Sequence, residues 1–234
     1  MSQSATTQSS TPTETECVCG RLTHHPACPV YVELADTRNR FAESGLLDVY
    51  VNGGKTLDTL QTNGEGLQRA IDAGRRWARG GGTSWLFFVS GEPGTGKTHV
   101  AAATLARSIE HGQRGRFTKL SRMLMEISDA PFGERVITFE KYSKAKRLVI
   151  DEVGAEKASS FTISMLSQVL DERYDAKRPT IITSNLTLDE LGDKWSPSDE
   201  VIAAQRIVDR IYEMTGGKSG EGRIRFDGKS WRKR

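Results

Sequence analysis

Short apolar runs alternate with amphipathic segments along most of the chain. The runs at residues 85–89, 116–120, 147–150 and 180–184 have the length and composition of buried strands. Between residues 65 and 78, apolar side chains recur at intervals of three and four, which is the spacing of one helix face. Further helices are expected at residues 98–110, 121–128, 134–145, 161–174, 188–192 and 199–214. Residues 30–63 have a mixed pattern that predicts no single element.

This order of elements predicts the fold class. Strands that alternate with helices form right-handed βαβ crossovers, and these build a parallel sheet with helices on both faces. We therefore expect an α/β fold, and 234 residues allow one such domain and a small appendage. The predicted parts are a flexible Ser/Thr-rich leader (1–16), a segment rich in Cys and His (17–36), a lead-in with one helix (37–83) and the core (84–234).

Charge and hydropathy narrow the class of protein. The formal net charge is +3, and residues 216–234 carry seven Lys and Arg against Glu221 and Asp227. Such a tail fits nucleic acid or another polyanion, with a solvated face as the alternative interpretation. The sequence has no apolar run of 18 residues, and its start lacks the basic and apolar regions of a secretion signal. We therefore expect a cytoplasmic protein without a membrane partner.

The segment SGEPGTGKTH, residues 90–99, lies between the first predicted strand and a predicted helix. Residues 91–98 fit the pattern GxxxxGK[ST], in which backbone N–H groups surround the phosphates of a nucleotide at a positive helix N-terminus. Lys97 adds a charge, and the Thr98 hydroxyl can bind Mg²⁺. The predicted nucleotide contacts are Gly91, Glu92, Pro93, Gly94, Thr95, Gly96, Lys97, Thr98 and His99.

Two other strands end in polar residues that suit hydrolysis. An apolar run ends at Asp151 and Glu152. As a strand it would place Asp151 near the Mg²⁺, and Glu152 where it can act as a base on the attacking water. A later strand ends in Asn185, whose amide can orient that water. In a parallel sheet we expect this strand to lie beside the strand that precedes the glycine-rich loop. An acidic or polar strand end that faces solvent is the alternative in each case.

Three cysteines and two histidines lie close together near the N-terminus. Three thiolates and one imidazole supply the four ligands of a structural zinc site, although the first cysteine pair has CxC rather than CxxC spacing. Reduced cysteines without metal are the alternative. The candidate ligands are Cys17, Cys19, Cys28 and either His24 or His25.

These motifs, in this order, resemble the DnaC/IstB branch of AAA+ ATPases. The resemblance covers residues 38–234 and includes an Arg206-Ile-Val-Asp-Arg210-Ile segment and a closing Phe226-Asp-Gly-Lys-Ser-Trp-Arg232 segment. The details favour the DnaC-type helicase loaders of bacteria or phages. The resemblance implies a P-loop fold with a parallel five-stranded sheet flanked by helices. The short Cys/His segment departs from the N-terminal modules of that family.

What the resemblance implies about function is specific. Loaders of this type bind ATP, form a spiral on single-stranded DNA and hold a ring-shaped, hexameric replicative helicase through an N-terminal module. By motif match, Arg210, with Arg206 beside it, is the arginine finger that completes a neighbour's ATP site. Arg232 matches a position that contacts the nucleotide of its own subunit. We therefore expect a Mg²⁺-dependent ATPase that is slow unless assembled.

Other functions stay open. The chain is alternatively an IstB-like helper that selects target DNA for a transposase, or a nucleotide-gated adaptor with little turnover. Two basic stretches are candidates for DNA contact. One contains Arg75, Arg76 and Arg79, and the other, residues 141–147, interleaves lysines and an arginine with Tyr142. For residues 141–147 an ordinary solvated face is the alternative.

Overall fold

The structure is a computed structural model that describes residues 29–51, 54, 56–62, 64–197 and 199–231. The chain divides into two compact units, Met1–Asn39 and Arg40–Arg234. Helix α1 (Pro29–Ser44) extends across this division. The described part of the second unit contains the sheet and every element discussed below.

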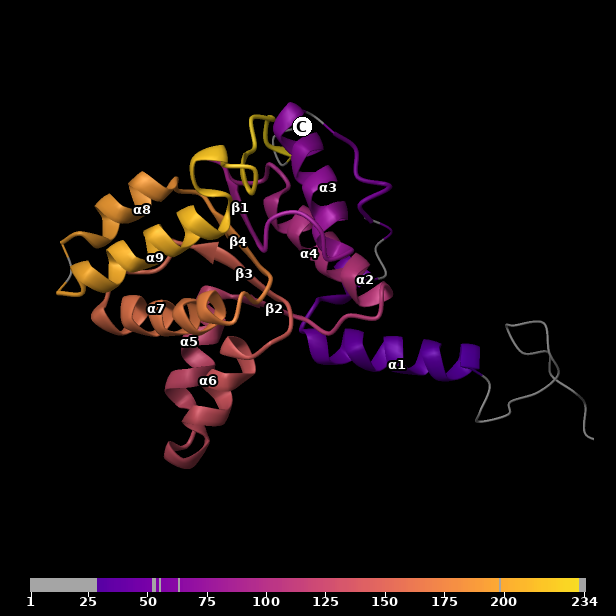
Figure 1. The fold of residues 1–234 in the computed structure, drawn as a ribbon, viewed down its shortest axis with the longest axis horizontal. Helices are drawn as coiled ribbons and strands as arrows, with labels where there is room; N and C mark the ends of the chain where they lie inside the picture. Colours follow the sequence, from indigo (N-terminus) through magenta and orange to yellow (C-terminus); the bar gives the residue numbers. More distant parts are fainter. Residues whose placement is uncertain (1–28, 52–53, 55, 63, 198, 232–234) are drawn as a thin grey trace, which may run out of the picture. The chain divides into compact units, whose positions relative to one another are not determined.

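A parallel sheet of five strands forms the centre of the second unit, in the order β2-β3-β4-β1-β5 (Figure 1). This confirms the expected parallel five-stranded sheet, and β4 lies beside β1 as predicted. The strands are β1 (Trp85–Val89), β2 (Arg116–Lys119), β3 (Leu148–Val153), β4 (Thr180–Ser184) and β5 (Arg223–Arg225). The hydropathy pattern did not identify β5, which has only three residues, two of them arginines.

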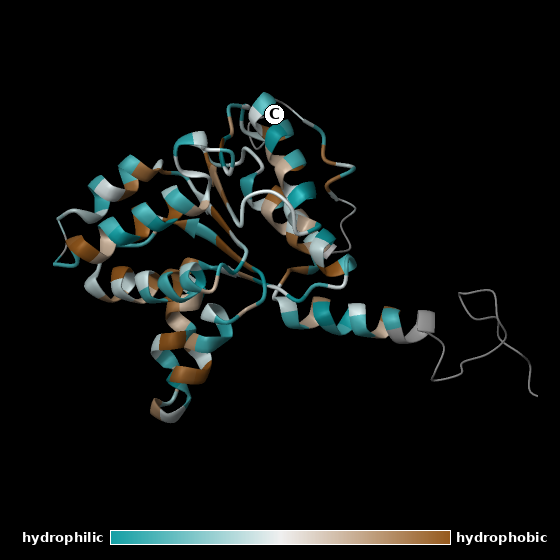
Figure 2. Cartoon of the chain, in the orientation of Figure 1, coloured by the Kyte–Doolittle hydropathy of each residue, from teal (hydrophilic) through white to brown (hydrophobic). Residues whose placement is uncertain are grey.

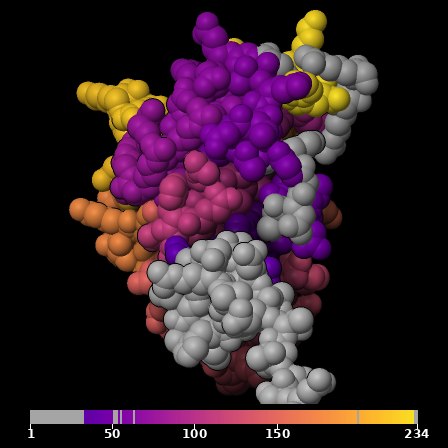
Figure 3. All heavy atoms as spheres, turned by 90° about the vertical axis from the view of Figure 1, so that its right-hand side faces the viewer, coloured from indigo at the N-terminus to yellow at the C-terminus, as the bar shows by residue number. Residues whose placement is uncertain are grey.

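Helices cover both faces of the sheet, as Figure 1 shows. The side chains of β1 alternate between two hydrophobic clusters. Phe87 packs with α7 (Ser160–Asp175), α8 (Leu188–Trp195) and α9 (Val201–Met214) on one face. Phe88 packs with α3 (Glu65–Ala78) and α4 (Lys97–Glu110) on the other. Strand β1 is therefore hydrophobic on both sides, whereas the outer sides of most helices are polar (Figure 2). Helices α3 and α4 lie side by side on their face (Figure 3).

The helices lie where the sequence pattern predicts them, except in residues 30–63. The helices of the core and its lead-in are α3 (Glu65–Ala78), α4 (Lys97–Glu110), α5 (Leu120–Asp129), α6 (Arg135–Ser143), α7 (Ser160–Asp175), α8 (Leu188–Trp195) and α9 (Val201–Met214). The short elements are α2 (Asp48–Val51) and the 3₁₀ turns Phe132–Glu134 and Gly217–Ser219. Residues 30–63, for which the sequence predicts no single element, include most of α1 and all of α2. The sequence does not indicate α1 because its amphipathic pattern is weak.

A buried arginine binds the backbone at the amino ends of β3 and β4. Arg173 of α7 is fully buried and donates hydrogen bonds to the carbonyls of Tyr142, Ser143, Ala145 and Pro179 and to the Thr180 hydroxyl. Burial lowers its pKa to about 9, and repulsion from a neighbouring arginine adds to the effect. The residues before β3 and β4 are thereby tied to one side chain, which holds these two strands in register.

Candidate nucleotide-binding site

The glycine-rich loop leaves the carboxyl end of β1 and enters α4. Gly94 and Gly96 have φ angles of 80° and 104°, in the left-handed region that favours glycine. Gly96 is the N-cap of α4 and has no side-chain cap, so the first N–H groups of the helix are available to an anion. The Glu92 N–H donates to the Ser90 hydroxyl at 3.1 Å, which fixes the start of the loop. The left-handed glycines and the uncapped helix N-terminus both suit the binding of a phosphate.

Lys97 is buried within this loop. Its ammonium group donates to the Glu92 carbonyl at 3.2 Å, across the span of the loop. Burial lowers the pKa of Lys97, while the charges of Asp151 and Glu152 oppose that change. A phosphate at this position would place a further negative charge beside the buried ammonium group.

Asp151 connects three segments of the site. Its Oδ1 accepts hydrogen bonds from the hydroxyls of Thr98 on α4 at 2.9 Å and Thr183 on β4 at 2.6 Å. The side chain is fully buried, and Oδ2 has no hydrogen-bond partner. Burial raises the pKa of Asp151, and the two hydroxyl bonds partly offset the rise. Sequence reasoning did not assign a role to Thr183; its place as a polar residue in the buried run TIITS was the available signal.

This donor set fits a magnesium ion. A buried carboxylate oxygen without a partner next to a hydroxyl oxygen is the oxygen-rich arrangement that Mg²⁺ prefers. Thr98 and Asp151 are the residues that would hold it. The structure therefore brings together the two residues that the sequence assigns to the metal.

Glu152 follows Asp151 in an irregular stretch of β3. From Ile150 to Val153 the chain takes three steps along β3, whereas the paired stretch of β4, from Ile182 to Ser184, takes two, which is a β-bulge. Glu152 has a φ of 61°, and its N–H donates to the Thr183 hydroxyl at 3.0 Å. Its carboxylate is half-exposed and lies 2.8 Å from the ammonium of Lys119 on β2. The candidate base is thus at the sheet edge where the phosphate loop begins.

Asn185 follows β4 at the same edge and is exposed. The preceding Ser184 is buried, and its hydroxyl donates to the Val153 carbonyl at 2.6 Å. This bond ties the end of β4 to the end of β3, so Asn185 and Glu152 follow neighbouring strands. His99, the last residue of the assigned loop, is half-buried and packs edge-on against Tyr50, with ring centroids 5.2 Å apart.

Arg206 and Arg210 lie on α9, on the opposite face of the sheet from α4. Both bind the carboxylate of Asp171 on α7, at 3.3 Å and 3.2 Å. The Arg210 guanidinium also lies 3.9 Å from the ring centre of Tyr174. The structure thus places the two arginines together, as the sequence predicts, and holds them on the α7/α9 face.

The C-terminal segment contacts the phosphate loop. The Phe226 N–H donates to the Val89 carbonyl at 2.8 Å, and the Trp231 N–H donates to the Gly94 carbonyl at 3.0 Å. Asp227 accepts from the Gly66 N–H at 3.1 Å and so joins this segment to α3. Arg232, assigned to the nucleotide by motif match, lies outside the described residues, as do Cys17, Cys19, His24, His25 and Cys28.

The structure argues against the candidate DNA contact at residues 141–147 in two respects. Tyr142 is buried, so its ring is not available for stacking on a base. Arg147 is buried over the ring of Trp77, at 4.5 Å from its centre. Lys141 and Lys144 form ion pairs with glutamates, since the helical packing that buries Tyr142 also brings Glu126 to Lys141.

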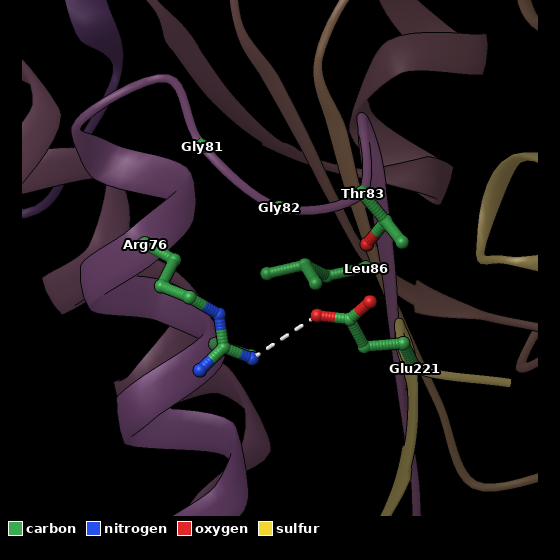
Figure 4. A pocket seen from close by; sticks show the side chains of 7 residues that line it. Arg76, Gly81, Gly82, Thr83, Leu86 and Glu221 are labelled. Carbon is green, nitrogen blue, oxygen red and sulfur yellow. Dashed lines mark hydrogen bonds and ion pairs between the residues drawn. The ribbon is translucent and has the colours of Figure 1, made fainter. Parts of the chain in front are cut away.

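A shallow hollow lies at the amino end of β1 (Figure 4). Arg76 and Glu221 face each other across it at 3.4 Å. Its other lining residues include Gly81, Gly82 and Thr83, which precede β1. The hollow is therefore at the opposite end of β1 from the phosphate loop and is not part of the candidate site. Within the described residues, no helix has the length and apolar character needed to cross a membrane.

Residues 86–234, which include the loop, Asp151 and both arginines, match the family described as IstB-like ATP binding protein. The chain belongs to this family. The resemblance to the DnaC/IstB branch that the motifs indicate is thereby confirmed.

Two relatives show what this chain is similar to. It is 28% identical over 174 residues to the replicative helicase loader DnaC of Buchnera aphidicola subsp. Acyrthosiphon pisum, across 72% of this chain and 69% of that protein. It is 29% identical over 194 residues to a putative insertion sequence ATP-binding protein of Sinorhizobium fredii, across 78% of this chain and 63% of that protein. The matches thus span about two thirds of the relatives' length.

Solved structures agree with the family. The IstB-like protein is similar to a crystal structure of the DnaC helicase loader, with a TM-score of 0.58 and 26% identity across 77% of this chain and 100% of that chain. It also has the fold of DnaI, with a TM-score of 0.62 and 22% identity across 75% of this chain and 89% of that chain. The P-loop fold with a five-stranded parallel sheet is therefore established.

Proposed function

We propose that this protein is a Mg²⁺-dependent ATPase that loads a replicative DNA helicase onto single-stranded DNA. One observation carries the ATPase part. Thr98 and Asp151 share a hydrogen bond beside the phosphate loop, and the second oxygen of the buried Asp151 carboxylate lacks a partner. Such an oxygen is costly unless a cation binds it.

The residues have distinct roles in this proposal. The N–H groups of the loop and Lys97 bind the phosphates of ATP, and bound Mg²⁺ neutralises charge on them. Thr98 and Asp151 hold that ion. Glu152 accepts a proton from the attacking water, and Asn185 orients the water from the neighbouring strand. His99, the last residue of the assigned loop, packs against Tyr50, and Arg232 contacts the nucleotide from the C-terminal segment.

A second subunit completes the site in this proposal. Arg210 and Arg206 lie on the α7/α9 face and act on the ATP of a neighbour, where a cation stabilises charge in the transition state. Asp171 holds both guanidinium groups in the isolated subunit. A contact of this head-to-tail kind generates a spiral if it does not close. Turnover is then slow in single subunits and faster in the assembly.

The loader role rests on the relatives named DnaC. Several of them are described as replicative helicase loaders, and the match to each covers about 72% of this chain. We propose a bacterial or phage-encoded cytoplasmic protein whose partners are a hexameric replicative helicase, single-stranded DNA and further copies of itself. The Cys/His segment at residues 17–36 would bind zinc and contact the helicase.

A second candidate function has its own support. The Sinorhizobium fredii relative is described as a putative insertion sequence ATP-binding protein. An ATPase that selects DNA for a transposase would use the same nucleotide site and the same assembly. The two functions therefore differ in the protein partner.

The experiment combines a hydrolysis assay with two binding assays. Glu152→Gln should abolish ATP hydrolysis and leave ATP binding intact, whereas Glu140→Gln, a change at another partly exposed glutamate, should alter neither. The Glu152→Gln protein, locked with ATP, is then mixed with a purified replicative helicase or with a transposase. Capture of the helicase supports the loader, and capture of the transposase alone supports the second candidate. Binding without any turnover in the wild type would refute the ATPase and indicate an adaptor.

A further inference from the structure

The phosphate loop carries a negative charge of its own. Glu92 is the second residue of the loop, and its side chain is exposed. Within the part of the chain that the structure describes, its carboxylate makes no hydrogen bond or ion pair. A carboxylate beside a bound triphosphate repels it, because like charges repel at short range. A side chain of this kind suits a cation that arrives from outside the subunit.

The backbone of Glu92 lies next to the ammonium group that is assigned to the phosphates. The Ser90 hydroxyl accepts from the Glu92 N–H and donates to the Glu92 carbonyl, both at 3.1 Å. The Lys97 ammonium donates to the same carbonyl at 3.2 Å. The position of Glu92 is thus fixed, while its carboxylate is free to bind. A cation that a neighbour brings to the phosphate beside Lys97 therefore comes within one side-chain length of this carboxylate.

The α7/α9 face has an excess of positive charge. One carboxylate, Asp171, pairs with both Arg206 and Arg210. Arg210 is 28% exposed, and its guanidinium also lies over the ring of Tyr174. Arg206 is 49% exposed and bonds to Asp171 through Nη1 at 3.3 Å. Of the two arginines, Arg206 can therefore leave Asp171 at the lower cost.

We propose that Glu92 is an interface residue that pairs with Arg206 of a second copy of this chain when ATP is bound. The proposal rests on the proposed head-to-tail assembly and deepens it. In the free subunit, two guanidinium groups share one carboxylate. In the assembly, Glu92 takes Arg206, so that Asp171 holds Arg210 alone and Arg210 faces the phosphate.

The charge of Glu92 also decides the kind of partner. A carboxylate on the loop repels the phosphates of DNA, so a nucleic acid is not the occupant. The face that carries Arg206 has the opposite charge, and complementary charges of this kind select a partner and fix its register. Because the loop and the α7/α9 face are different surfaces, the contact is of the head-to-tail type.

The size of the effect follows from the exposure of the two side chains. Both are accessible to water and salt, which screen their attraction. An exposed ion pair changes an association constant by up to about fivefold. Reversal of one charge has a larger effect, about tenfold or more, because like charges then meet across the interface.

The first test measures assembly by sedimentation velocity, with Mg²⁺ and the non-hydrolysable analogue adenylyl imidodiphosphate. Glu92→Gln should weaken association by up to about fivefold, and Glu92→Arg by about tenfold or more. Glu134→Gln, at another exposed glutamate, should leave association unchanged. A wild type that stays monomeric with the analogue, or a Glu92→Arg protein that assembles normally, would overturn the proposal.

A charge swap identifies the partner of Glu92. Arg206→Glu alone should weaken association. The double variant with Glu92→Arg should associate more tightly than the sum of the two single losses predicts, because opposite charges meet again across the interface. Losses that simply add would mean that the two side chains do not meet.

Nucleotide binding separates a role in the interface from a role within the loop. In calorimetry on dilute, monomeric protein, Glu92→Gln should bind the analogue more tightly, by up to about fivefold, because a charge that repels the phosphates is gone. Weaker binding would mean that Glu92 supports its own loop, against the proposal. If the wild type never hydrolyses ATP but the charge swap restores assembly, the proposed ATPase fails and the contact stands.

Discussion

Asp151→Asn should stabilise the nucleotide-free protein while it removes the metal site. Asp151 is fully buried, and its Oδ2 has no partner, so its charge is poorly compensated without a cation. Desolvation of a buried ion costs several kcal/mol. A neutral amide keeps the shape of the side chain and the two hydroxyl bonds at Oδ1. Functional residues often carry such a cost in the absence of their ligand.

The expected change in the free energy of unfolding is the balance of these opposing contributions. Two hydrogen bonds lose their charge-assisted part, about 1 kcal/mol each, because bonds to charged groups are worth about 1.5–3 kcal/mol and neutral ones about 0.5–1.5 kcal/mol. The amide nitrogen that replaces Oδ2 also lacks a partner, which costs about 1–3 kcal/mol. Relief of the desolvation cost of the charge outweighs both losses, and we expect a net gain of about 1 kcal/mol. For a protein of this length, that gain raises Tm by roughly 2–4 °C.

Thermal unfolding with and without ligand tests this reasoning. With EDTA and no nucleotide, the Tm of Asp151→Asn should be higher than that of the wild type. The control Asp209→Asn, at an exposed position on α9, should have the Tm of the wild type. With Mg²⁺ and ATP at about one hundred times Kd, the wild type should gain about 2.7 kcal/mol, or roughly 5–11 °C. The Tm of Asp151→Asn should rise much less, so that with ligand the wild type has the higher Tm. A variant that melts lower without ligand, or gains the full shift with it, would refute the argument.

Three further predictions concern stability. Arg173→Met should lower the free energy of unfolding by about 3–5 kcal/mol in urea denaturation, since buried carbonyls lose their donor; a loss below about 1 kcal/mol would contradict this. Burial alone would raise the pKa of Glu126, but hydrogen bonds from three neighbours outweigh it and lower the pKa to about 2. The charged Glu126 therefore stabilises the fold above about pH 4.5, and this stabilisation is lost as the pH falls toward 2. Glu126→Gln should lower the free energy of unfolding at pH 7 and leave it unchanged near pH 2; equal changes at both pH values would contradict the direction of this pKa shift. Gly66→Ala should destabilise by about 1–3 kcal/mol, because its Cβ would lie 2.0 Å from the Arg225 carbonyl, whereas Gly133→Ala, in open space, should be neutral; a neutral Gly66→Ala would mean that α3 shifts freely.

Local patterns predicted the core of the site. The loop at residues 91–98 is contiguous, and its function depends on backbone conformations that glycine alone adopts readily. The strands before it and before Asp151 are apolar runs, and parallel strands bring their carboxyl ends to one edge. These features therefore needed only sequence neighbours and a fold class to be inferred.

Contacts between distant segments escaped the same reasoning. Residues 141–147 read as an exposed basic and aromatic stretch, but packing against α5 and α7 buries Tyr142. Sequence spacing does not reveal that Thr183 bonds to Asp151 across 32 positions. The helix α1 was missed because its apolar pattern is weak, and β5 because three residues with two arginines do not resemble a strand.

The sequence by itself determined the phosphate loop, the carboxylates that follow β3 and the alternation of strands and helices, because each depends on residues that are adjacent in the chain. Only the tertiary structure decided which neighbours those groups have. The strand order places β2 and β4 on opposite sides of β3, so Asp151 bonds to Thr183 and Glu152 to Lys119. Burial, ion pairing and the direction of a side chain are set by segments that meet only when the sheet has formed.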